Sequence, residues 1–228
     1  MKKETVDSII VVGAGGFGAE VVGYLRDIDA RNAATGTMPR LRIIGVVDNF
    51  VGTAAPTDVC GVPFLGGEDA ASAHGDCLFV VATGTPRYRQ EAFARLHARG
   101  WRLYTLVHPA AIVSSEAKVG AGSIIAPFAI VNARARVGNG CVANVFCSIG
   151  HDTLLGDYSV LSPYAALNGF AKAGELCFLG TRATIFPKVQ IGDGCQVDAH
   201  SYVRANVGDR MIVSMRGVYR VLLNRLER

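Results

Sequence analysis

The stretch AIVSSEAKVGAGSIIAPFAIVNARARVGNGCVANVFCSIG, residues 111–150, repeats one pattern every six residues. An apolar residue recurs at each sixth position from Val113 to Val203 without a slip in register. A small residue stands two places before almost every one of them, and glycine or asparagine most often stands one place after. A fixed six-residue period is typical of a parallel β-helix, in which each coil buries its faces against the next.

Each position of the hexad has a physical interpretation. The apolar residue points into a narrow prism, and the small residue leaves room for it. The glycine or asparagine after it is expected to take a turn conformation that a β-carbon resists. Three hexads to a coil predict about five coils. Free cysteine behaves as a small hydrophobe, so the cysteines of the small-residue column are expected to be reduced packing residues. They are Cys141, Cys147, Cys177 and Cys195.

Residues 7–105 follow a different pattern, in which strand-like and helix-like segments alternate. This alternation predicts a Rossmann-like α/β domain with a small parallel sheet and helices on its faces. The segment DARNAATGTMPR, residues 29–40, is expected to be an exposed loop. The expected strands lie at 8–12, 41–48, 77–84 and 102–107, and the expected helices follow the glycine turn at 13–18 and begin near Pro86.

The two patterns divide the chain into an N-terminal domain over 1–107, a β-helix domain over 108–210 and a C-terminal segment over 211–228. The net charge of +4 is modest and its basic residues are mostly scattered, so a nucleic-acid-binding surface is not indicated. No apolar run approaches the roughly 18 residues that span a bilayer, and the N-terminus lacks the features of a signal peptide. We therefore expect a cytoplasmic protein without membrane insertion.

With this repeat, the chain resembles the left-handed β-helix hexapeptide acyltransferases. Five segments narrow the resemblance to the bacterial sugar acetyltransferases that comprise sialic-acid O-acetyltransferase-like proteins and N-acetyltransferases of nucleotide-linked amino sugars. The segments are VVGAGGFGAEVV (11–22), VVDN (46–49), VATGTPRYRQ (81–90), HPAAIVSSEAKVGAGSIIAPFAIVNARARVG (108–138) and NVFCSIGHDTLLGDYSVLSPYAALNG (144–169). The likeness extends from about residue 8 to residue 205.

The resemblance implies acetyl-CoA as the donor, a nucleotide-linked sugar bound to the N-terminal domain, and a role in polysaccharide biosynthesis. It also implies a homotrimer with an active site between neighbouring subunits. A packed prism has no internal pocket, so a cleft at the junction of two prisms is physically reasonable, and three-fold closure would supply three equivalent clefts.

A GxGxxG motif at Gly13, Gly15 and Gly18 lies between an expected strand and an expected helix, where backbone N–H groups favour a phosphate. A complete dinucleotide fold needs two mononucleotide halves, and only about a hundred residues precede the repeat. We therefore expect half a nucleotide site at the carboxyl ends of the strands, and a glycine turn that serves only helix packing is the alternative. The candidate nucleotide-sugar-binding residues are Gly13, Gly15, Gly16, Phe17, Asp48, Asn49, Gly84, Thr85 and Arg87.

His151 lies two places after Ile149, on the turn side of its hexad, so its side chain is expected to project outward. By position alone it could equally be a polar turn residue. The match of IGHD to the family motif implies that His151 is the general base, which takes a proton from the acceptor as it attacks the thioester. The same match implies that Asp152 makes His151 more basic, whereas a solvated turn aspartate is the other interpretation. Successive residues on a strand point to opposite faces, so contact between the two requires turn geometry or a neighbouring subunit.

The resemblance also implies donor-binding positions. A backbone N–H at Gly169 is the candidate for stabilising the thioester oxygen, with Gly180 and Thr181 farther along the pantetheine path. Lys188, Arg182 and Arg204 are candidates for contacts with the phosphates of CoA. The chain departs from the family pattern at Phe17 and Val160, where relatives carry histidine, and in MIVSMRGVYRVLL (211–223), which lacks a Gly-x-Pro-Ala-Lys-like segment. The candidate acetyl-CoA-binding residues are Val160, Gly169, Gly180, Thr181 and Lys188.

Several functions stay open. The leading hypothesis is acetylation of the amino group of a nucleotide-linked 4-amino-deoxysugar, with sugar O-acetylation as the variant. A second is a non-catalytic nucleotide-sugar-binding protein of the same fold. A third, a β-helix metalloenzyme of the carbonic anhydrase type, needs three histidines at one site. His151 and His200 are too sparse for that, so no metal is expected.

Overall fold

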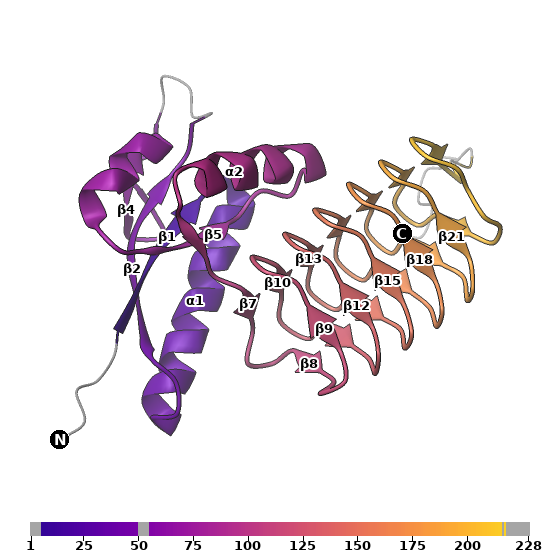
Figure 1. The fold of residues 1–228 in the computed structure, drawn as a ribbon, viewed down its shortest axis with the longest axis horizontal. Coiled ribbons are helices and arrows are strands. Elements are labelled where there is room, and N and C mark those ends of the chain that lie inside the picture. Colours follow the sequence, from indigo (N-terminus) through magenta and orange to yellow (C-terminus); the bar gives the residue numbers. More distant parts are fainter. Residues whose placement is uncertain (1–5, 50–54, 216, 218–228) are drawn as a thin grey trace, which may run out of the picture.

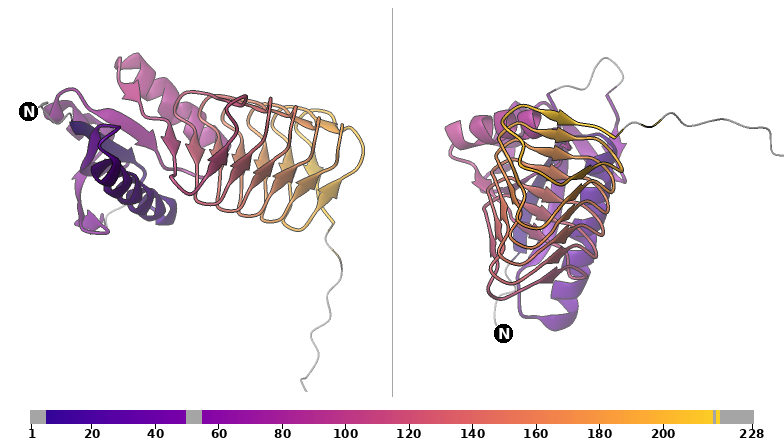
Figure 2. Two further views of the ribbon diagram at one scale, coloured as in Figure 1. Left: turned by 90° about the horizontal axis from the view of Figure 1, so that it is seen from below. Right: turned by 90° about the vertical axis from the view of Figure 1, so that its right-hand side faces the viewer.

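The computed structural model describes residues 6–49, 55–215 and 217 of the 228-residue chain. An α/β domain stands at one end, and a β-helix extends from it coil by coil toward the C-terminal end (Figure 1). Seen along its axis, the β-helix has three sides (Figure 2). Residues 216 and 218–228, which belong to the expected C-terminal segment, lie outside the described residues.

The N-terminal sheet has the strand order β3-β4-β2-β1-β5-β6. Its strands are β1 (Val6–Val12), β2 (Arg40–Val47), β3 (Asp58–Val59), β4 (Val62–Gly66), β5 (Leu78–Val81) and β6 (Arg102–Leu103). All neighbours pair in parallel except β3 and β4, which form an antiparallel hairpin. The parallel sheet is confirmed, and the hairpin is an addition that the sequence pattern did not indicate. Its turn consists of Cys60 and Gly61, both with positive φ, as a two-residue hairpin requires.

The helices are α1 (Gly16–Thr35), α2 (Pro86–Ala98) and the short 3-10 helix η1 (Glu68–His74). The expectation of a loop over 29–40 was wrong for its first half, because α1 continues through Thr35. The alanines of this segment favour helix, and the helix ends only where Gly36 takes the left-handed conformation, with φ 64°. Asp29 then accepts hydrogen bonds from the Arg40 side chain and the Leu41 N–H, which ties the helix to the start of β2.

The β-helix contains three parallel sheets, one on each side of the prism. The β7 sheet comprises β7 (Leu106–Val107), β10 (Ile124–Ile125), β13 (Val142–Ala143), β16 (Val160–Leu161), β19 (Phe178–Leu179), β22 (Gln196–Val197) and β24 (Ile212–Val213). The β8 sheet comprises β8 (Ile112–Val113), β11 (Ile130–Val131), β14 (Ser148–Ile149), β17 (Ala166–Leu167), β20 (Thr184–Ile185) and β23 (Tyr202–Val203). The β9 sheet comprises β9 (Lys118–Val119), β12 (Arg136–Val137), β15 (Leu154–Leu155), β18 (Lys172–Ala173) and β21 (Gln190–Ile191).

The register confirms three hexads to a coil. Ile124 pairs with Val142 and Val142 with Val160, so each residue lies beside its equivalent in the next coil. The expected strand at 102–107 is in fact two: β6 completes the N-terminal sheet, and β7 pairs with β10 in the β-helix.

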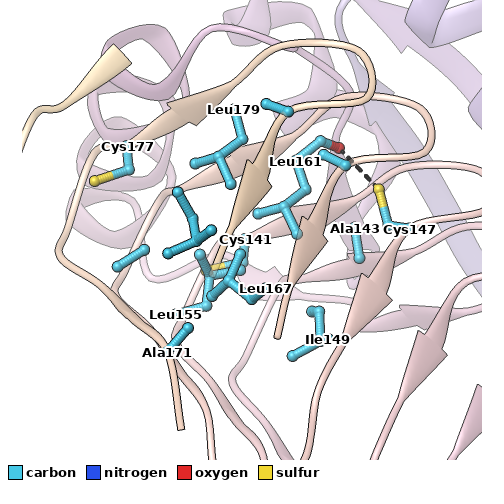
Figure 3. Packing of buried hydrophobic residues seen from close by; sticks show 14 of the residues in the cluster. Cys141, Ala143, Cys147, Ile149, Leu155, Leu161, Leu167, Ala171, Cys177 and Leu179 are labelled. Atoms are coloured by element: carbon cyan, nitrogen blue, oxygen red, sulfur yellow. Dashed lines mark hydrogen bonds between the residues drawn. The ribbon is translucent and has the colours of Figure 1, made fainter. Parts of the chain in front are cut away.

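The apolar and small-residue columns form the core of the prism. Ile149 and Leu161 are fully buried, and Cys147 beside them is 1% exposed (Figure 3). The thiol of Cys147 donates to the backbone oxygen of Leu161 at 3.5 Å, and burial raises the pKa of the Cys141 and Cys147 thiols to about 12. All four column cysteines are free and buried, which confirms their interpretation as reduced packing residues.

The glycine and asparagine column does not have the predicted turn conformation. Positive φ belongs to the residue three places after the apolar residue, and that residue is mostly not glycine, as at Asp152 with φ 58°. Glycine is required instead for close stacking of the coils, because a β-carbon on Gly150 would lie 2.7 Å from the amide nitrogen of Gly169 in the next coil. Asparagine in this column donates across coils, as Asn132 does to the backbone oxygen of Ile149.

The β7 sheet packs against the N-terminal domain. Leu106, Ile124 and Val160 belong to the same hydrophobic cluster as Val21 and Leu25 of α1. A second connection is polar: the fully buried guanidinium of Arg89 donates to the backbone oxygens of Gly140 (2.6 Å) in the β-helix and of Val81 (2.7 Å) at the end of β5. In the described part of the chain, none of the helices has the length and hydropathy to cross a bilayer.

Candidate functional site

His151 lies at the corner between the β8 and β9 sheets, after β14 and before β15. Its side chain is 55% exposed, as the hexad register predicts. The ring atom Nδ1 lies 2.8 Å from Oδ2 of Asp152. This contact between consecutive residues depends on turn geometry, because Asp152 occupies the left-handed corner position. A neighbouring subunit is therefore not needed for the pair.

Arg134 holds the carboxylate of Asp152 from the other side. Its Nε and NH2 atoms donate to the two oxygens of Asp152 at 2.8 and 2.9 Å, and its NH1 reaches Glu116 at 3.3 Å. Hydrogen bonds from Arg134 first, and from His151 second, lower the pKa of Asp152 to about 2. Asp152 is thus a carboxylate at neutral pH. Arg134 was not among the expected site residues, although its place 18 residues before Asp152 makes it the equivalent corner residue one coil earlier.

The other ring nitrogen of His151 faces the backbone of the next coil. A β-carbon on Gly169 would lie 2.7 Å from Nε2 and 2.8 Å from Cε1 of His151. The ring of Phe170 contacts the imidazole edge-on, with ring centroids 5.2 Å apart. Within the described residues, the Gly169 N–H makes no hydrogen bond to a protein acceptor. Nε2 and a backbone amide without a protein acceptor therefore lie at the same corner.

The other expected donor-binding residues lie in three places. Lys188 shares the corner of His151, since its N–H donates to the Gly169 oxygen at 3.1 Å. Gly180 and Thr181 lie at the corner between the β7 and β8 sheets, after β19. Val160 is 3% exposed and packs in the cluster that joins the β-helix to the N-terminal domain.

Two further expected cations stack on aromatic rings. Arg182 lies over the ring of Tyr164 at 4.8 Å, beside Thr181. Arg204 lies over the rings of Tyr202 (4.5 Å) and Phe186 (5.6 Å).

A cavity of about 350 Å³ opens at the carboxyl ends of the strands in the N-terminal domain. Seven of the nine predicted nucleotide-sugar residues line it: Gly13, Gly15, Gly16, Phe17, Asp48, Asn49 and Gly84. Thr85 and Arg87 are not among its lining residues. Thr85 caps α2, and Arg87 pairs with Glu91 at 3.1 Å on the exposed side of the helix.

The glycines of the motif have two different roles. Gly13 has φ 121°, and a β-carbon there would lie 2.7 Å from the backbone oxygen of Ala82, so glycine is needed for the fold. Gly18 is needed because a β-carbon would overlap the backbone oxygen of Gly13. At Gly15 and Gly16 a β-carbon would meet nothing within 4 Å, because both face the cavity. Helix α1 begins here without a side-chain cap, which leaves its first N–H groups for an anion.

Seven lining residues were not among those expected: the polar Glu68, Thr83, Tyr88 and Arg95, and the apolar Val12, Ala82 and Ala92. Glu68 is 1% exposed and is held by both Nε and NH2 of Arg95. Tyr88, Ala92 and Arg95 line the cavity from one face of α2, a helical spacing of i, i+4 and i+7. That spacing was visible in the sequence, but only the fold shows which face of α2 turns toward the glycine loop.

Two other side-chain oxygens hold the cavity wall together. The Oδ2 atom of Asp48 accepts from the Ala14 N–H at 2.8 Å, which fixes the glycine loop to the end of β2. The Oδ1 atom of Asn49 accepts from the Glu68 N–H at 2.7 Å. In the part of the chain that the structure describes, no cluster of three or more His, Cys, Asp or Glu side chains is placed to hold a metal ion.

The cavity and His151 do not meet within one chain. The N-terminal domain contacts the β-helix through the β7 sheet and through the corner of Gly140, where Arg89 donates. His151 lies at the corner opposite the β7 sheet, between the other two sheets. No residue of the β-helix is among those that line the cavity.

Comparisons with known proteins find matches for both the N-terminal domain and the β-helix. Residues 8–96 match the family of PglD N-terminal domains. One similar solved structure is a mutant of perosamine N-acetyltransferase from Caulobacter crescentus in complex with CoA and GDP-perosamine. Its sequence is 28% identical and its TM-score is 0.78, and the match covers 90% of this chain and 92% of that chain. The acetyltransferase domain of PglB from Neisseria gonorrhoeae FA1090, in complex with acetyl coenzyme A, is 27% identical with a TM-score of 0.74, covering 90% and 94%.

WeeI from Acinetobacter baumannii AYE has the same fold, with 23% identity, a TM-score of 0.76 and coverage of 92% of this chain and 97% of that chain. No curated protein sequence matches the chain. The likeness to the perosamine and PglB enzymes covers 90% of this chain in both cases and therefore extends over both domains. The chain is accordingly an acyltransferase of the sugar acetyltransferase type, with a PglD N-terminal domain and a left-handed β-helix of hexapeptide repeats.

Proposed function

We propose that the chain transfers the acetyl group of acetyl-CoA to the amino group of a nucleotide-linked 4-amino-deoxysugar, with His151 as the general base. The observation that carries this proposal is the row of side chains from Arg134 through Asp152 to His151, which leaves Nε2 open beside Gly169. CoA and GDP-perosamine in the perosamine N-acetyltransferase complex, and acetyl coenzyme A in the PglB complex, support the choice of donor and acceptor.

The geometry gives the two ring nitrogens different roles. A charged Asp152 accepts a hydrogen bond, so Nδ1 of His151 carries the hydrogen and Nε2 presents a lone pair to the acceptor. As the amine attacks the thioester carbon, the new C–N bond forms and the amine proton passes to Nε2. General-base help of this kind is worth about 10²–10⁴ in rate. Asp152 stabilises the imidazolium that results.

The attacked carbonyl oxygen becomes negatively charged, and the free N–H of Gly169 is placed to stabilise it. When the intermediate collapses, the C–S bond breaks and the thiolate of CoA takes the proton back from Nε2. The transfer is therefore direct, without an acyl-enzyme. A sugar hydroxyl could follow the same course, so O-acetylation is the alternative outcome at this corner.

The nucleotide of the acceptor belongs in the cavity of the N-terminal domain, where Gly15 and Gly16 leave open space that a side chain would otherwise occupy. Because that cavity and His151 lie on different sides of one chain, the sugar must reach the His151 of a neighbouring chain. A homotrimer would create three such clefts. Exposed apolar residues beside the His151 corner support a subunit contact on the β8 sheet, with Ile112 63% and Ile130 36% exposed.

We place the reaction in the cytoplasm. All six cysteines are free, which fits a reducing compartment.

The test is a chromatographic assay of free CoA with purified protein, acetyl-CoA and a panel of nucleotide-linked amino sugars. We expect CoA release with at least one 4-amino sugar, loss of that release in His151→Ala, and unchanged release in the control His97→Ala, which alters an exposed histidine of α2. Sedimentation should show the same oligomer for all three proteins. Full activity of His151→Ala would refute the general base. Tight binding of nucleotide sugars without CoA release from the wild type would instead identify a non-catalytic binding protein.

A further inference from the structure

A hollow of about 500 Å³ lies on the β9 sheet, directly beside Asp152. Its lining contains four cations and two carboxylates, a net charge of +2. The two carboxylates, Asp152 and Glu116, are both bound by Arg134. The lining residues that remain charged and exposed are Lys118, Arg136 and Lys172.

These three cations lack an ion-pair partner in the part of the chain that the structure describes. Within the described residues, none of their side chains makes an ion pair or a hydrogen bond. Lys118 and Arg136 pair directly with each other on neighbouring parallel strands, and Arg136 and Lys172 both adjoin Leu154 between them. Like charges at directly paired positions are destabilising. Lys118 and Arg136 therefore lower the stability of the folded chain unless an anion occupies the hollow.

The spacing suits a phosphate. Neighbouring strands lie about 4.8 Å apart, so the guanidinium of Arg136 and the ammonium of Lys118 can approach one phosphoryl group together. Arginine binds phosphate through two parallel N–H donors, and lysine adds a point charge. Four of the five β9-sheet strands continue into a buried column residue, such as Val137 or Leu155, which anchors the strand in the prism.

The position of the hollow beside His151 indicates whether the bound phosphate belongs to the sugar nucleotide or to CoA. Asp152 lines the hollow and lies 2.8 Å from Nδ1 of His151, so the hollow adjoins the base. In a sugar nucleotide, the phosphate on the anomeric carbon lies across one sugar ring from the 4-amino group. In CoA, the whole pantetheine arm separates the thioester from the nearest phosphate. A phosphate this close to the reacting atoms therefore belongs to the acceptor.

We infer that Lys118, Arg136 and Lys172 form an anion subsite for the sugar-linked phosphate of the nucleotide-linked acceptor, while its amino group lies at His151. This inference rests on the proposed function. The glycine loop of the neighbouring chain then holds the nucleoside side of the same diphosphate. The subsite makes the β-helix, as well as the N-terminal domain, a determinant of acceptor binding.

The kinetic test uses the single variants Lys118→Gln, Arg136→Gln and Lys172→Gln, with Arg31→Gln on exposed α1 as a charge-matched control. Loss of a charge-assisted hydrogen bond should raise the KM for the nucleotide sugar about tenfold in each hollow variant. The kcat and the KM for acetyl-CoA should stay within about twofold of wild type, and the control should match wild type throughout. A rise confined to the KM for acetyl-CoA would assign the hollow to CoA and overturn the inference.

A binding test is independent of turnover. Calorimetry with inorganic pyrophosphate, on the His151→Ala protein with and without Arg136→Gln, should show weaker binding when Arg136 is replaced. Equal binding by the two proteins would overturn the inference, even if the wild type acetylates a sugar. Sedimentation of the hollow variants is the third measurement. A change of oligomeric mass would assign the cations to a subunit contact and would also overturn the inference. If no sugar is acetylated by the wild type, the proposed function fails, while the pyrophosphate measurement still decides the subsite.

Discussion

Gly169→Ala tests the role of Nε2 most directly, because it adds one methyl group at a known position. The new β-carbon would lie 2.7 Å from Nε2 and 2.8 Å from Cε1 of His151. An ordinary contact needs about 3.5–4.0 Å, so the imidazole must move by roughly 1 Å. Its bond to Asp152 and its edge contact with Phe170 leave it little freedom to do so without losing the alignment of Nε2.

The expected loss follows from that displacement. A misplacement of about 1 Å in a catalytic group can cost about 10²-fold in rate, so kcat should fall about a hundredfold. The backbone tolerates alanine here, because Gly169 does not have a positive φ. We therefore expect the free energy of unfolding to change by less than about 1 kcal/mol, in either direction.

Steady-state CoA release and urea unfolding measure the two quantities, with Gly208→Ala as the matched control. A β-carbon on Gly208 would meet no atom within 4 Å, and that glycine also lacks a positive φ. The control should keep wild-type activity and stability. A Gly169→Ala protein with a kcat within about twofold of wild type would refute the requirement for this position of Nε2. A loss of activity that merely follows a loss of stability would refute the side-chain explanation too.

Three further predictions concern stability and reactivity. Arg134→Gln should lower kcat. Because Arg134 depresses the pKa of Asp152 to about 2, the Arg134–Asp152 ion pair contributes stability above about pH 4 that is lost as the pH falls through about 2. The difference in Tm between wild type and variant should therefore shrink as the pH falls from about 4 to about 2, and a constant difference would contradict this. Leu161→Ala empties a fully buried position of the prism and should reduce the free energy of unfolding in urea by about 2–5 kcal/mol, so a loss below about 1 kcal/mol would count against tight packing there. A thiol reagent at pH 8 should modify only Cys60 quickly in the native protein, since the other five cysteines are buried, and should modify all six after unfolding. Rapid modification of the column cysteines in the native state would refute their burial.

Most of the fold could be predicted because its determinants are local. The six-residue period identified the β-helix, the burial of its columns and the outward direction of His151. The expectation about the glycine column was wrong because period alone does not distinguish a φ requirement from a stacking requirement. Only the stacked coils show that a β-carbon on Gly150 would overlap the next coil. The end of α1 was misplaced for a similar reason, since Gly36 rather than the loop-like composition before it terminates the helix.

Some residues of the candidate site could also be predicted from local motifs, and others could not. The glycine loop and the ends of β1, β2 and β5 were placed correctly by their motifs, and seven of the nine expected residues line one cavity. Arg95 and Tyr88 were missed, because a helix face has no direction until it packs on a sheet. Arg134 was missed because nothing near Asp152 in the sequence points to it.

By itself, the sequence determined the repeat, the order of strands and helices, and which residues of each hexad face inward, since all of these depend on neighbours within a few positions along the chain. The tertiary structure decided what lies one coil away. It brought Arg134 to Asp152, Gly169 to His151 and Lys118 to Arg136, each pair 18 residues apart in sequence. Such contacts exist only once three hexads close a coil and the next coil stacks on it, because only then do equivalent positions of successive coils align into columns.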